Sequence, residues 1–311
     1  MSDLLSRRQM LAAGVATGVA APFLGLATTP ARASAPQQGI AAVDFRRVKL
    51  GEFEVTTLLA GTRSVPDPQT IFGMNASAED FAAASEKAHI PIDAAQFFFT
   101  PTLVNTGTEL VLFDTGLNAA GITAALAAAG HTPDQIDVVV LTHMHGDHIG
   151  GLSDDGGAAT FANARYVTGV TEFDHWAGAG NDGFEAKMRP LAEQTDMLSG
   201  GGTVTSGIEA IEAFGHTPGH MAYRIESAGK NLIVAADFAN HYVWSLAYPD
   251  WEVRFDMDKS AAAATRKSLL SMMAADKLPF IGYHMPFPAI GYVDQGDSGY
   301  SYTPMSYQLM L

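Results

Sequence analysis

The sequence predicts a layered α/β sandwich built as one domain, and three observations lead to this prediction. First, the expected strands begin as hairpins and then alternate with helices, and this succession occurs twice. Second, the chain has 311 residues, 47% of them hydrophobic and 16% charged, which is enough apolar material for a large core. Third, no repeat and no linker divides residues 36–311.

In the first half, apolar periodicity and breaks at glycine or proline mark the expected elements. The alanine-rich helix ends before Gly130, a glycine C-cap. The valine-rich run that follows is continuously apolar, which is typical of a buried strand. The expected elements are a hairpin over 48–59, a helix over 77–87 inside an inserted segment, 60–96, strands over 97–105 and 109–114, a helix over 119–129 and a buried strand over 138–141.

The second half repeats the alternation of strands and helices. The glycines at 200–202 end one helix, and Asp258 is placed to cap the start of another. The remaining segments are short apolar runs bounded by turn residues. The expected elements are strands over 161–168, 208–214, 222–227, 232–236, 280–283 and 300–309, with helices over 185–198 and 258–275.

Residues 1–35 have the features of an export signal. Arg7 and Arg8 precede an apolar run that glycines and a proline interrupt, so the run is too short and too broken for a stable membrane anchor. Small residues offer cleavage after Ala33 or Ala35. The adjacent arginines resemble the twin-arginine class of signals, which predicts a periplasmic or secreted protein.

Composition excludes several classes of function. The formal net charge is −15 without a basic stripe, which argues against a nucleic-acid partner. The chain has no cysteine, so it can form no disulfide and offers no thiolate as nucleophile or metal ligand. Any metal must be bound by imidazole and carboxylate groups, which suits zinc and similar divalent ions.

The strongest motif is the segment 141–151, which holds four potential metal ligands within six positions. Side chains two residues apart in an extended turn can point at one place, so His143 and His145 can share an ion. Asp147 and His148 follow at once and can serve a second ion nearby. Such a cluster at the end of a buried strand predicts a metal site.

Further residues of ligand type stand where other expected strands end. His216 and His220 lie in a glycine-rich turn between two strands. Asp237 closes the strand 232–236, and His284 follows the strand that ends at Tyr283. One histidine alone would carry little weight, but their recurrence at successive strand ends indicates a common rim.

This series resembles the ligand series of the metallo-β-lactamase superfamily, and more narrowly of its methyl parathion hydrolase and quorum-quenching lactonase branch. The resemblance spans about residues 45–311. It implies an αββα four-layer sandwich with two divalent metal ions on its rim. Zinc is the expected metal, with iron, manganese and cobalt as alternatives. The residues that carry the resemblance are His143, His145, Asp147, His148, His220, Asp237 and His284.

The resemblance also implies a role for each ligand. Asp237 bridges the two ions together with a hydroxide that attacks the substrate. Asp147 takes up the released proton, Asp114 orients a ligand histidine, and His216 lies beside the ligands. The implied triads are His143, His145 and His220 for one ion and Asp147, His148 and His284 for the other.

The implied activity is hydrolysis of a small lactone or carboxylic ester by an enzyme, with a homodimer left open. The inserted segment is expected near the substrate pocket. The candidates for the apolar wall and lining of the pocket are Phe97, Phe98, Phe99, Trp176, Phe184 and His241. The first alternative is a dedicated organophosphate hydrolase acting on phosphotriesters. The segment after Gly116 offers no aromatic residue of the kind that shapes the leaving-group pocket in parathion hydrolases.

The second alternative is a non-haem iron oxidoreductase on the same fold, which binds a single iron. The full ligand series favours two metals. The third alternative, a binding protein without activity, is disfavoured because no ligand is missing. The acidic composition and the export signal also disfavour nucleases of this fold.

Overall fold

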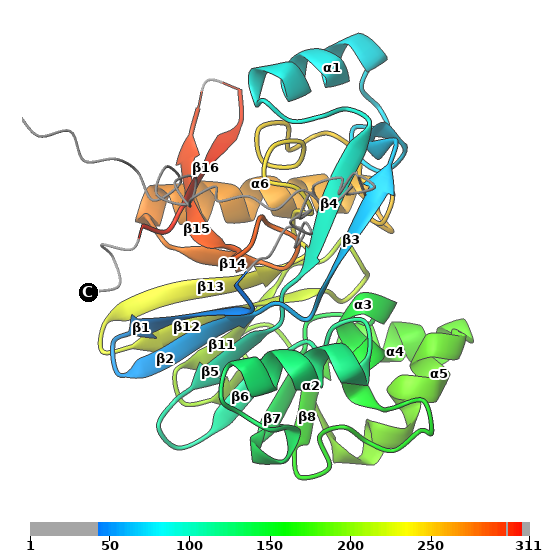
Figure 1. Ribbon diagram of the computed structural model, residues 1–311, viewed down its shortest axis with the longest axis vertical. Helices are drawn as coiled ribbons and strands as arrows, with labels where there is room; N and C mark the ends of the chain where they lie inside the picture. The colour runs from blue at the N-terminus through cyan, green and yellow to red at the C-terminus, as the bar shows by residue number, and fades with distance from the viewer. Residues whose placement is uncertain (1–42, 297, 307–311) are drawn as a thin grey trace, which may run out of the picture. The chain divides into compact units, whose positions relative to one another are not determined.

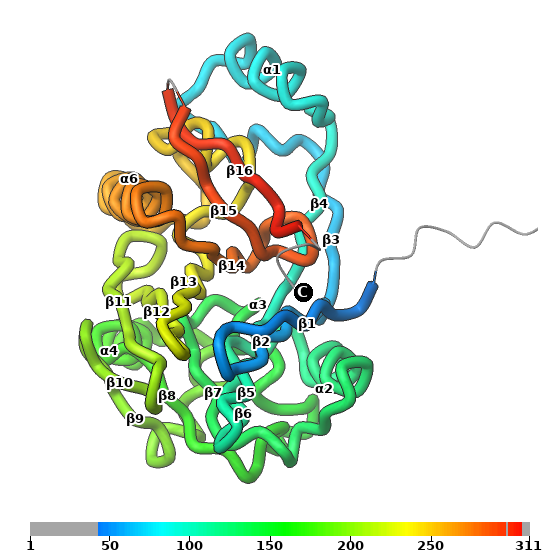
Figure 2. The backbone as a smooth tube through the Cα atoms, turned by 90° about the vertical axis from the view of Figure 1, so that its left-hand side faces the viewer, coloured from blue at the N-terminus to red at the C-terminus, as the bar shows by residue number. Residues whose placement is uncertain are grey.

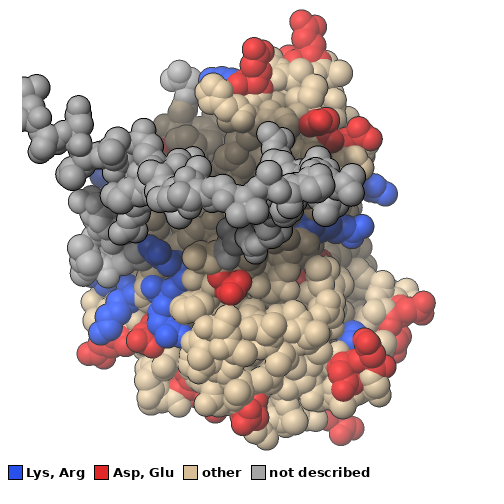
Figure 3. All heavy atoms as spheres, in the orientation of Figure 1, with Lys and Arg blue, Asp and Glu red and all other residues tan. Residues whose placement is uncertain are grey.

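The computed structural model describes residues 43–296 and 298–306. The expected export signal, 1–35, lies outside the described residues, and so does the end of the last expected strand. Within the described part, no helix is both long and apolar enough to cross a membrane. Acidic side chains are spread over the face shown in Figure 3. The sequence predicts this spread, because its net charge of −15 is not concentrated in long charged runs.

Two seven-stranded sheets form the centre of the fold (Figure 1). The first has the order β1 (Phe45–Leu50), β2 (Phe53–Leu58), β5 (Thr102–Asn105), β6 (Leu110–Phe113), β7 (Val138–Leu141), β8 (Arg165–Gly169) and β9 (Thr195–Leu198). The second has the order β10 (Thr203–Thr205), β11 (Ile208–Glu212), β12 (Met221–Ser227), β13 (Lys230–Ala236), β14 (Phe280–Gly282), β15 (Ile290–Gln295) and β16 (Tyr300–Pro304).

The alternation of side chains along the central strands makes the layers. Val138 and Val140 of β7 join the cluster that also contains Tyr223 of the second sheet. Val139 and Leu141 of the same strand join a different cluster, together with residues of the helix α2. Because successive side chains point to opposite faces of a sheet, the all-apolar sequence of β7 buries both of its faces.

Helices cover the outer faces of both sheets, which completes the αββα sandwich (Figure 1). On the first sheet these are α2 (Ala119–Ala128), α4 (Val170–Ala179) and α5 (Asp182–Lys187). On the second it is α6 (Lys259–Asp276), capped by Asp258, whose side chain accepts from the Ala261 N–H at 2.9 Å. Short helical turns occupy α3 (Gly146–Ile149), η1 (Pro68–Thr70), η2 (Pro133–Gln135), η3 (Gly150–Leu152) and η4 (Arg189–Gln194).

The inserted segment is more regular than its prolines suggested. It contains β3 (Gly61–Pro66), the predicted helix as α1 (Ala78–Lys87), and β4 (Ala94–Phe99). The two strands pair as an antiparallel hairpin apart from both large sheets. Figures 1 and 2 show them rising side by side to α1.

Several elements of the structure differ from the sequence predictions. The strand 97–105 divides into β4 and β5 at Thr100 and Pro101, because proline lacks the N–H that a continued ladder needs. The helix 185–198 ends at Lys187, and its last residues form β9 as a sheet edge. Helix α4 and strand β15 were not expected, since neither has a distinctive apolar period.

Parallel pairing brings the ends of several strands to one place. Strands β6, β7 and β8 run parallel in the first sheet, and β13 and β14 run parallel in the second. The carboxyl ends of neighbouring parallel strands lie at one edge of a sheet, where loops collect side chains. Asp114, His143, Asp237 and His284 all follow such ends.

Candidate metal centre

Asp114 anchors the loop that carries the histidine motif. Its carboxylate accepts from the N–H and the hydroxyl of Thr142 at 2.9 and 2.8 Å. It also accepts from Nδ1 of His148 at 2.8 Å, which leaves Nε2 of that ring aimed into the site. Its backbone adopts the left-handed region with φ of 60°, and these bonds offset the conformational cost.

The carboxylate of Asp237 is the centre of the site. It is 3% exposed and stands directly after β13. Imidazole nitrogens approach it from three different loops, which the sequence separates by up to 141 positions. The Nε2 atoms around its two oxygens belong to His284 at 3.2 Å, His216 at 3.4 Å, His148 at 3.5 Å and His143 at 4.0 Å.

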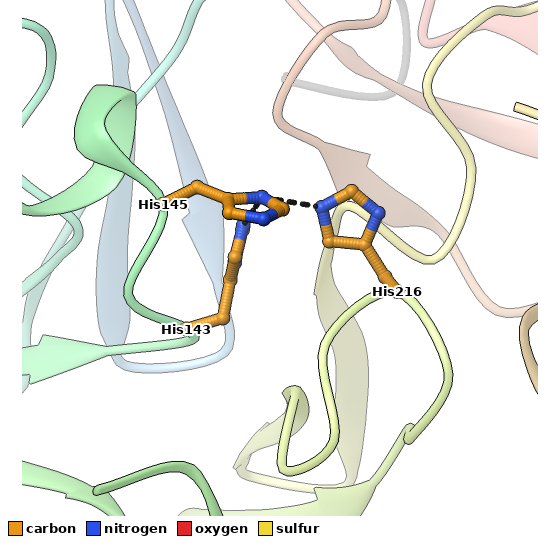
Figure 4. A group of neighbouring side chains, drawn as sticks. All are labelled: His143, His145 and His216. Atoms are coloured by element: carbon orange, nitrogen blue, oxygen red, sulfur yellow. Dashed lines mark hydrogen bonds between the residues drawn. The ribbon is translucent and has the colours of Figure 1, made fainter. Parts of the chain in front are cut away.

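Three overlapping groups of side chains have the spacing of a metal site, with ligand atoms within 4.8 Å of one another. Figure 4 shows one of them, in which the rings of His143 and His145 turn toward the ring of His216. The groups are His143, His145 and His216; His143, His148 and Asp237; and Asp147, His148 and His284.

The structure groups His216, and not His220, with the first two histidines of the motif. Nε2 of His216 lies 3.0 Å from Nδ1 of His145. Both nitrogens of His220 are occupied by the backbone: Nδ1 donates to the Ala213 carbonyl and Nε2 accepts from the Asp237 N–H, each at 3.1 Å. His220 lies beside this group, with its ring centroid 5.0 Å from that of His143, and its assignment as a metal ligand stays a prediction.

Asp256 holds His216 in this orientation, and the sequence analysis did not identify it. Its carboxylate accepts from His216 Nδ1 at 2.9 Å and from the buried guanidinium of Arg266 at 2.7 Å. Burial raises the pKa of Asp256, but the His216 hydrogen bond and the Arg266 charge outweigh it, so the pKa is lowered. A carboxylate behind a ligand histidine fixes which nitrogen faces the metal.

Glu172, at the start of α4, is a second residue that the sequence analysis missed. It is fully buried and accepts four hydrogen bonds. Oε1 accepts from the Met144 N–H at 2.9 Å and from the Trp176 indole at 2.6 Å. Oε2 accepts from the Thr217 hydroxyl at 2.7 Å and from the Gly219 N–H at 2.9 Å. This side chain therefore joins the two loops that carry the histidines.

The electrostatics of the site favour ligands ready for a cation. Burial, reinforced by the neighbouring imidazoles, lowers the pKa of His145 to about 3 and that of His143 well below its usual range. Burial lowers the pKa of His284 as well, but the carboxylates of Asp237 and Asp147 outweigh it and raise the value to about 10. His143 and His145 are therefore neutral rings, the form that metals bind, whereas His284 must lose its proton when an ion binds beside the carboxylates.

Two buried polar atoms at the centre lack a hydrogen-bond partner: His148 Nε2 and Asp237 Oδ1, 3.5 Å apart. Buried polar groups are nearly always satisfied, so this pair marks a place that a bound group would complete. Imidazole nitrogen and carboxylate oxygen are ligands of zinc and related divalent ions. The residues present therefore fit metal ions.

A cavity of about 700 Å³ opens above the ligands. Its floor includes His145, Asp147, Asp237 and His284. Residues 63–71 of the inserted segment form part of its wall. The apolar side chains that line it are Val65, Ile71, Phe97, Phe99, Leu117 and Phe255.

Of the expected pocket residues, Phe97 and Phe99 line this cavity, and the other four lie elsewhere. Phe98 and His241 line a separate cavity of about 250 Å³ behind His284. Phe98 points away from the larger cavity because it alternates along β4 with Phe97 and Phe99. The other two belong to the core of the first sheet, where Phe184 is fully buried and Trp176 lies edge-on to His145 at 5.9 Å.

Among solved structures, the chain is similar to AidC, a dizinc quorum-quenching lactonase. That match has a TM-score of 0.78 and 25% sequence identity, and it covers 85% of this chain and 98% of AidC. It is also similar in fold to the hydrolase AbOPH of the beta lactamase superfamily, with a TM-score of 0.80 at 23% identity, over 86% of this chain and 99% of the other.

Curated relatives match shorter stretches. Exodeoxyribonuclease WalJ of Streptococcus pneumoniae is 28% identical over 140 residues, which cover 43% of this chain and 48% of WalJ. The chain thus spans about half the length of this relative. Anti-Pycsar protein Apyc1 of Saccharibacillus brassicae is 26% identical over 184 residues, which cover 59% of this chain and 68% of that protein. The expected exclusion of nucleic acid finds no support here, because one relative is a nuclease.

The family assignment comes from the region that contains the whole site. Residues 100–284 match the profile of the metallo-beta-lactamase superfamily, and this span is more than half of the chain. It begins before Asp114 and ends on His284, so it includes every residue that surrounds Asp237. The four layers, the strand ends that carry the ligands and the profile agree, and the chain belongs to the metallo-beta-lactamase superfamily.

Proposed function

We propose that this protein is a two-metal hydrolase that cleaves the ester bond of a small lactone or carboxylic ester. The observation that carries the proposal is a chain of three ligand groups, linked through His143 and His148, beside a largely apolar cavity. The similarity to AidC, a dizinc lactonase, supports the choice of bond and of two ions.

Each ligand has a place in this proposal. His143, His145 and His216 would hold one ion, and Asp147, His148 and His284 the other, with Asp237 between them. Zinc fits this donor set, and iron, manganese and cobalt are alternatives. Two such ions supply an activated water and polarise the carbonyl oxygen of the substrate.

Asp147 is suited to receive the proton that the attacking water loses. Its side chain is 24% exposed and lines the cavity. Burial raises its pKa, but the neighbouring His148 and the hydrogen bond from His284 outweigh it and bring the pKa to about 2. The group is therefore a carboxylate at neutral pH, the form that binds an ion, and it becomes a stronger proton acceptor when His148 and His284 lose their protons on metal binding.

The test combines metal analysis with turnover. We expect close to two divalent ions per purified chain, and hydrolysis of aryl esters or acyl lactones faster than of a phosphotriester. Asp237→Asn keeps the size of the central side chain and should lower kcat by orders of magnitude. A single iron with oxygen consumption would overturn the proposal, and so would cleavage of single-stranded DNA without ester hydrolysis.

We further propose that the protein acts outside the cytoplasm, since Arg7 and Arg8 lead a signal of the twin-arginine type. Replacing both by lysine should trap the precursor in the cytoplasm, as fractionation with an antibody would show. Export at the normal rate would instead place the signal on the general secretory route.

A further inference from the structure

Two arginines stand on the wall of the cavity above the metal centre. Arg63 belongs to β3 and Arg254 to the loop before α6. Both side chains line the cavity and both residues are exposed, so they lie where the cavity meets solvent. The Arg254 N–H donates to the Ile71 carbonyl at 2.7 Å, which ties its loop to the inserted segment.

Among the described residues, neither guanidinium has a partner of opposite charge. In the part of the chain that the structure describes, Arg63 and Arg254 form no side-chain hydrogen bond or salt bridge. Arg165, Arg189 and Arg266 each pair with a carboxylate. Acidic residues outnumber lysine and arginine by 33 to 18, so partners are plentiful elsewhere on the chain.

Besides the two arginines, metal ligands and apolar side chains line the cavity. Its only acidic side chains are Asp147 and Asp237, which belong to the metal centre. Phe97 and Phe255 form part of the apolar wall and meet edge-on at 6.4 Å. The lining of the cavity thus combines metal ligands, apolar surface and two guanidinium groups that have no carboxylate partner among the described residues.

We propose that the substrate carries an anionic group, a carboxylate or a similar oxyanion, at the end of an apolar segment that leads away from the scissile ester. The inference rests on the proposed function and adds the class of substrate to it. Arg63 and Arg254 bind the anion, because a guanidinium group matches a carboxylate with two parallel hydrogen bonds. The apolar segment lies along the aromatic wall.

The test uses matched pairs of substrates. The 4-nitrophenyl half-esters of butanedioic, pentanedioic, hexanedioic and octanedioic acid end in a carboxylate. The 4-nitrophenyl esters of the corresponding straight-chain monocarboxylic acids end in a methyl group instead. For at least one chain length, the ratio of kcat/KM values should favour the half-ester, and this preference should shrink at high salt.

Variants then assign the preference to the two arginines. Arg63→Gln and Arg254→Gln should each lower the ratio by roughly two- to fivefold, the range expected for exposed charge pairs. Arg224→Gln removes an arginine that does not line this cavity and should leave the ratio unchanged. A ratio near one, or a ratio that neither cavity variant changes, overturns the inference.

A calorimetric measurement of binding tests this inference independently of ester hydrolysis, on which the proposed function rests. Octanedioate should bind the metal-loaded protein more tightly than octanoate by calorimetry, and Arg63→Gln with Arg254→Gln should remove the difference. Equal affinities in the wild type overturn the anion site even if esters are hydrolysed. If neither ester series is hydrolysed but the calorimetric difference is found, the proposed function fails and the anion site stands.

Discussion

The direction of two ring nitrogens decides the roles of His216 and His220. Both lie in one turn, 215–220, and both are buried. Asp256 takes Nδ1 of His216 and leaves Nε2 toward Asp237. Backbone groups take both nitrogens of His220, and burial lowers the pKa of that ring to about 3. His216 is thus grouped with His143 and His145, whereas His220 contacts the Asp237 backbone.

Separate alanine variants test this division. His216→Ala should lose about one bound ion per chain, because it removes a ligand from the first group. His220→Ala should keep both ions and lower the free energy of unfolding by about 2–3 kcal/mol, because it leaves the Asp237 N–H unpaired. Metal analysis and denaturant titration measure the two effects. Loss of an ion from His220→Ala alone would contradict the assignment.

At the scale of elements, Glu172 couples helix α4 to both histidine loops. In Glu172, Oε1 accepts from the Met144 N–H and Oε2 accepts from the Gly219 N–H. Whichever way the glutamine amide of Glu172→Gln is turned, its NH2 group therefore faces a backbone N–H and one hydrogen bond is lost. We therefore expect a loss of about 2–3 kcal/mol in the free energy of unfolding and weaker metal binding.

The neighbouring helix provides the control for this variant. Glu185→Gln in α5 changes an exposed residue that pairs with Arg189 at the surface. It should leave both the metal content and the melting temperature unchanged. If Glu172→Gln behaves like Glu185→Gln in both measurements, Glu172 does not stabilise the metal centre.

The loop after β7 requires glycine at one position and tolerates a side chain at another. A Cβ on Gly151 would lie 2.1 Å from the Thr115 carbonyl oxygen, whereas a Cβ on Gly146 meets nothing within 4 Å. Gly151→Ala should cost about 1–3 kcal/mol in the free energy of unfolding by overpacking. Gly146→Ala at the start of α3 should be neutral or slightly stabilising. Equal denaturation midpoints would show that the loop can move aside.

For the whole molecule, the metal centre joins the two halves of the sandwich. His143 and His148 follow the first sheet, while Asp237 and His284 follow strands of the second. Without ions, buried imidazole and carboxylate groups at this junction lack full partners. Ligands that bind only the folded state stabilise it, by about 4 kcal/mol at a thousandfold excess over Kd.

Metal removal should therefore lower the melting temperature of the whole domain. A chelator should shift Tm by about 10 °C, given roughly 2–4 °C per kcal/mol for a domain of this size. Calorimetry with and without the chelator measures the shift, and zinc added back should restore the original value. An unchanged Tm after confirmed metal loss would show that the centre does not couple the sheets.

The sequence placed most strands and the histidine motif correctly, because these depend on local chemistry. Alternation and continuous valine runs predicted β7 and the hairpin of β1 and β2. The capping aspartate and the glycine breaks predicted α6 and α2. Helix 185–198 was wrong in its second half because pairing with β8 at the sheet edge, a contact distant in sequence, makes residues 195–198 a strand.

What the sequence by itself determined is the chemistry available: a cysteine-free chain whose histidines and aspartates stand at strand ends. Only the tertiary structure decided which group each ring nitrogen faces, and it set His216 beside His143 and His145. It also revealed Glu172, Arg63 and Arg254, whose roles depend on neighbours far away in the chain. The physical reason is that ligand type is a property of one residue, whereas orientation, burial and charge pairing arise from contacts between distant segments.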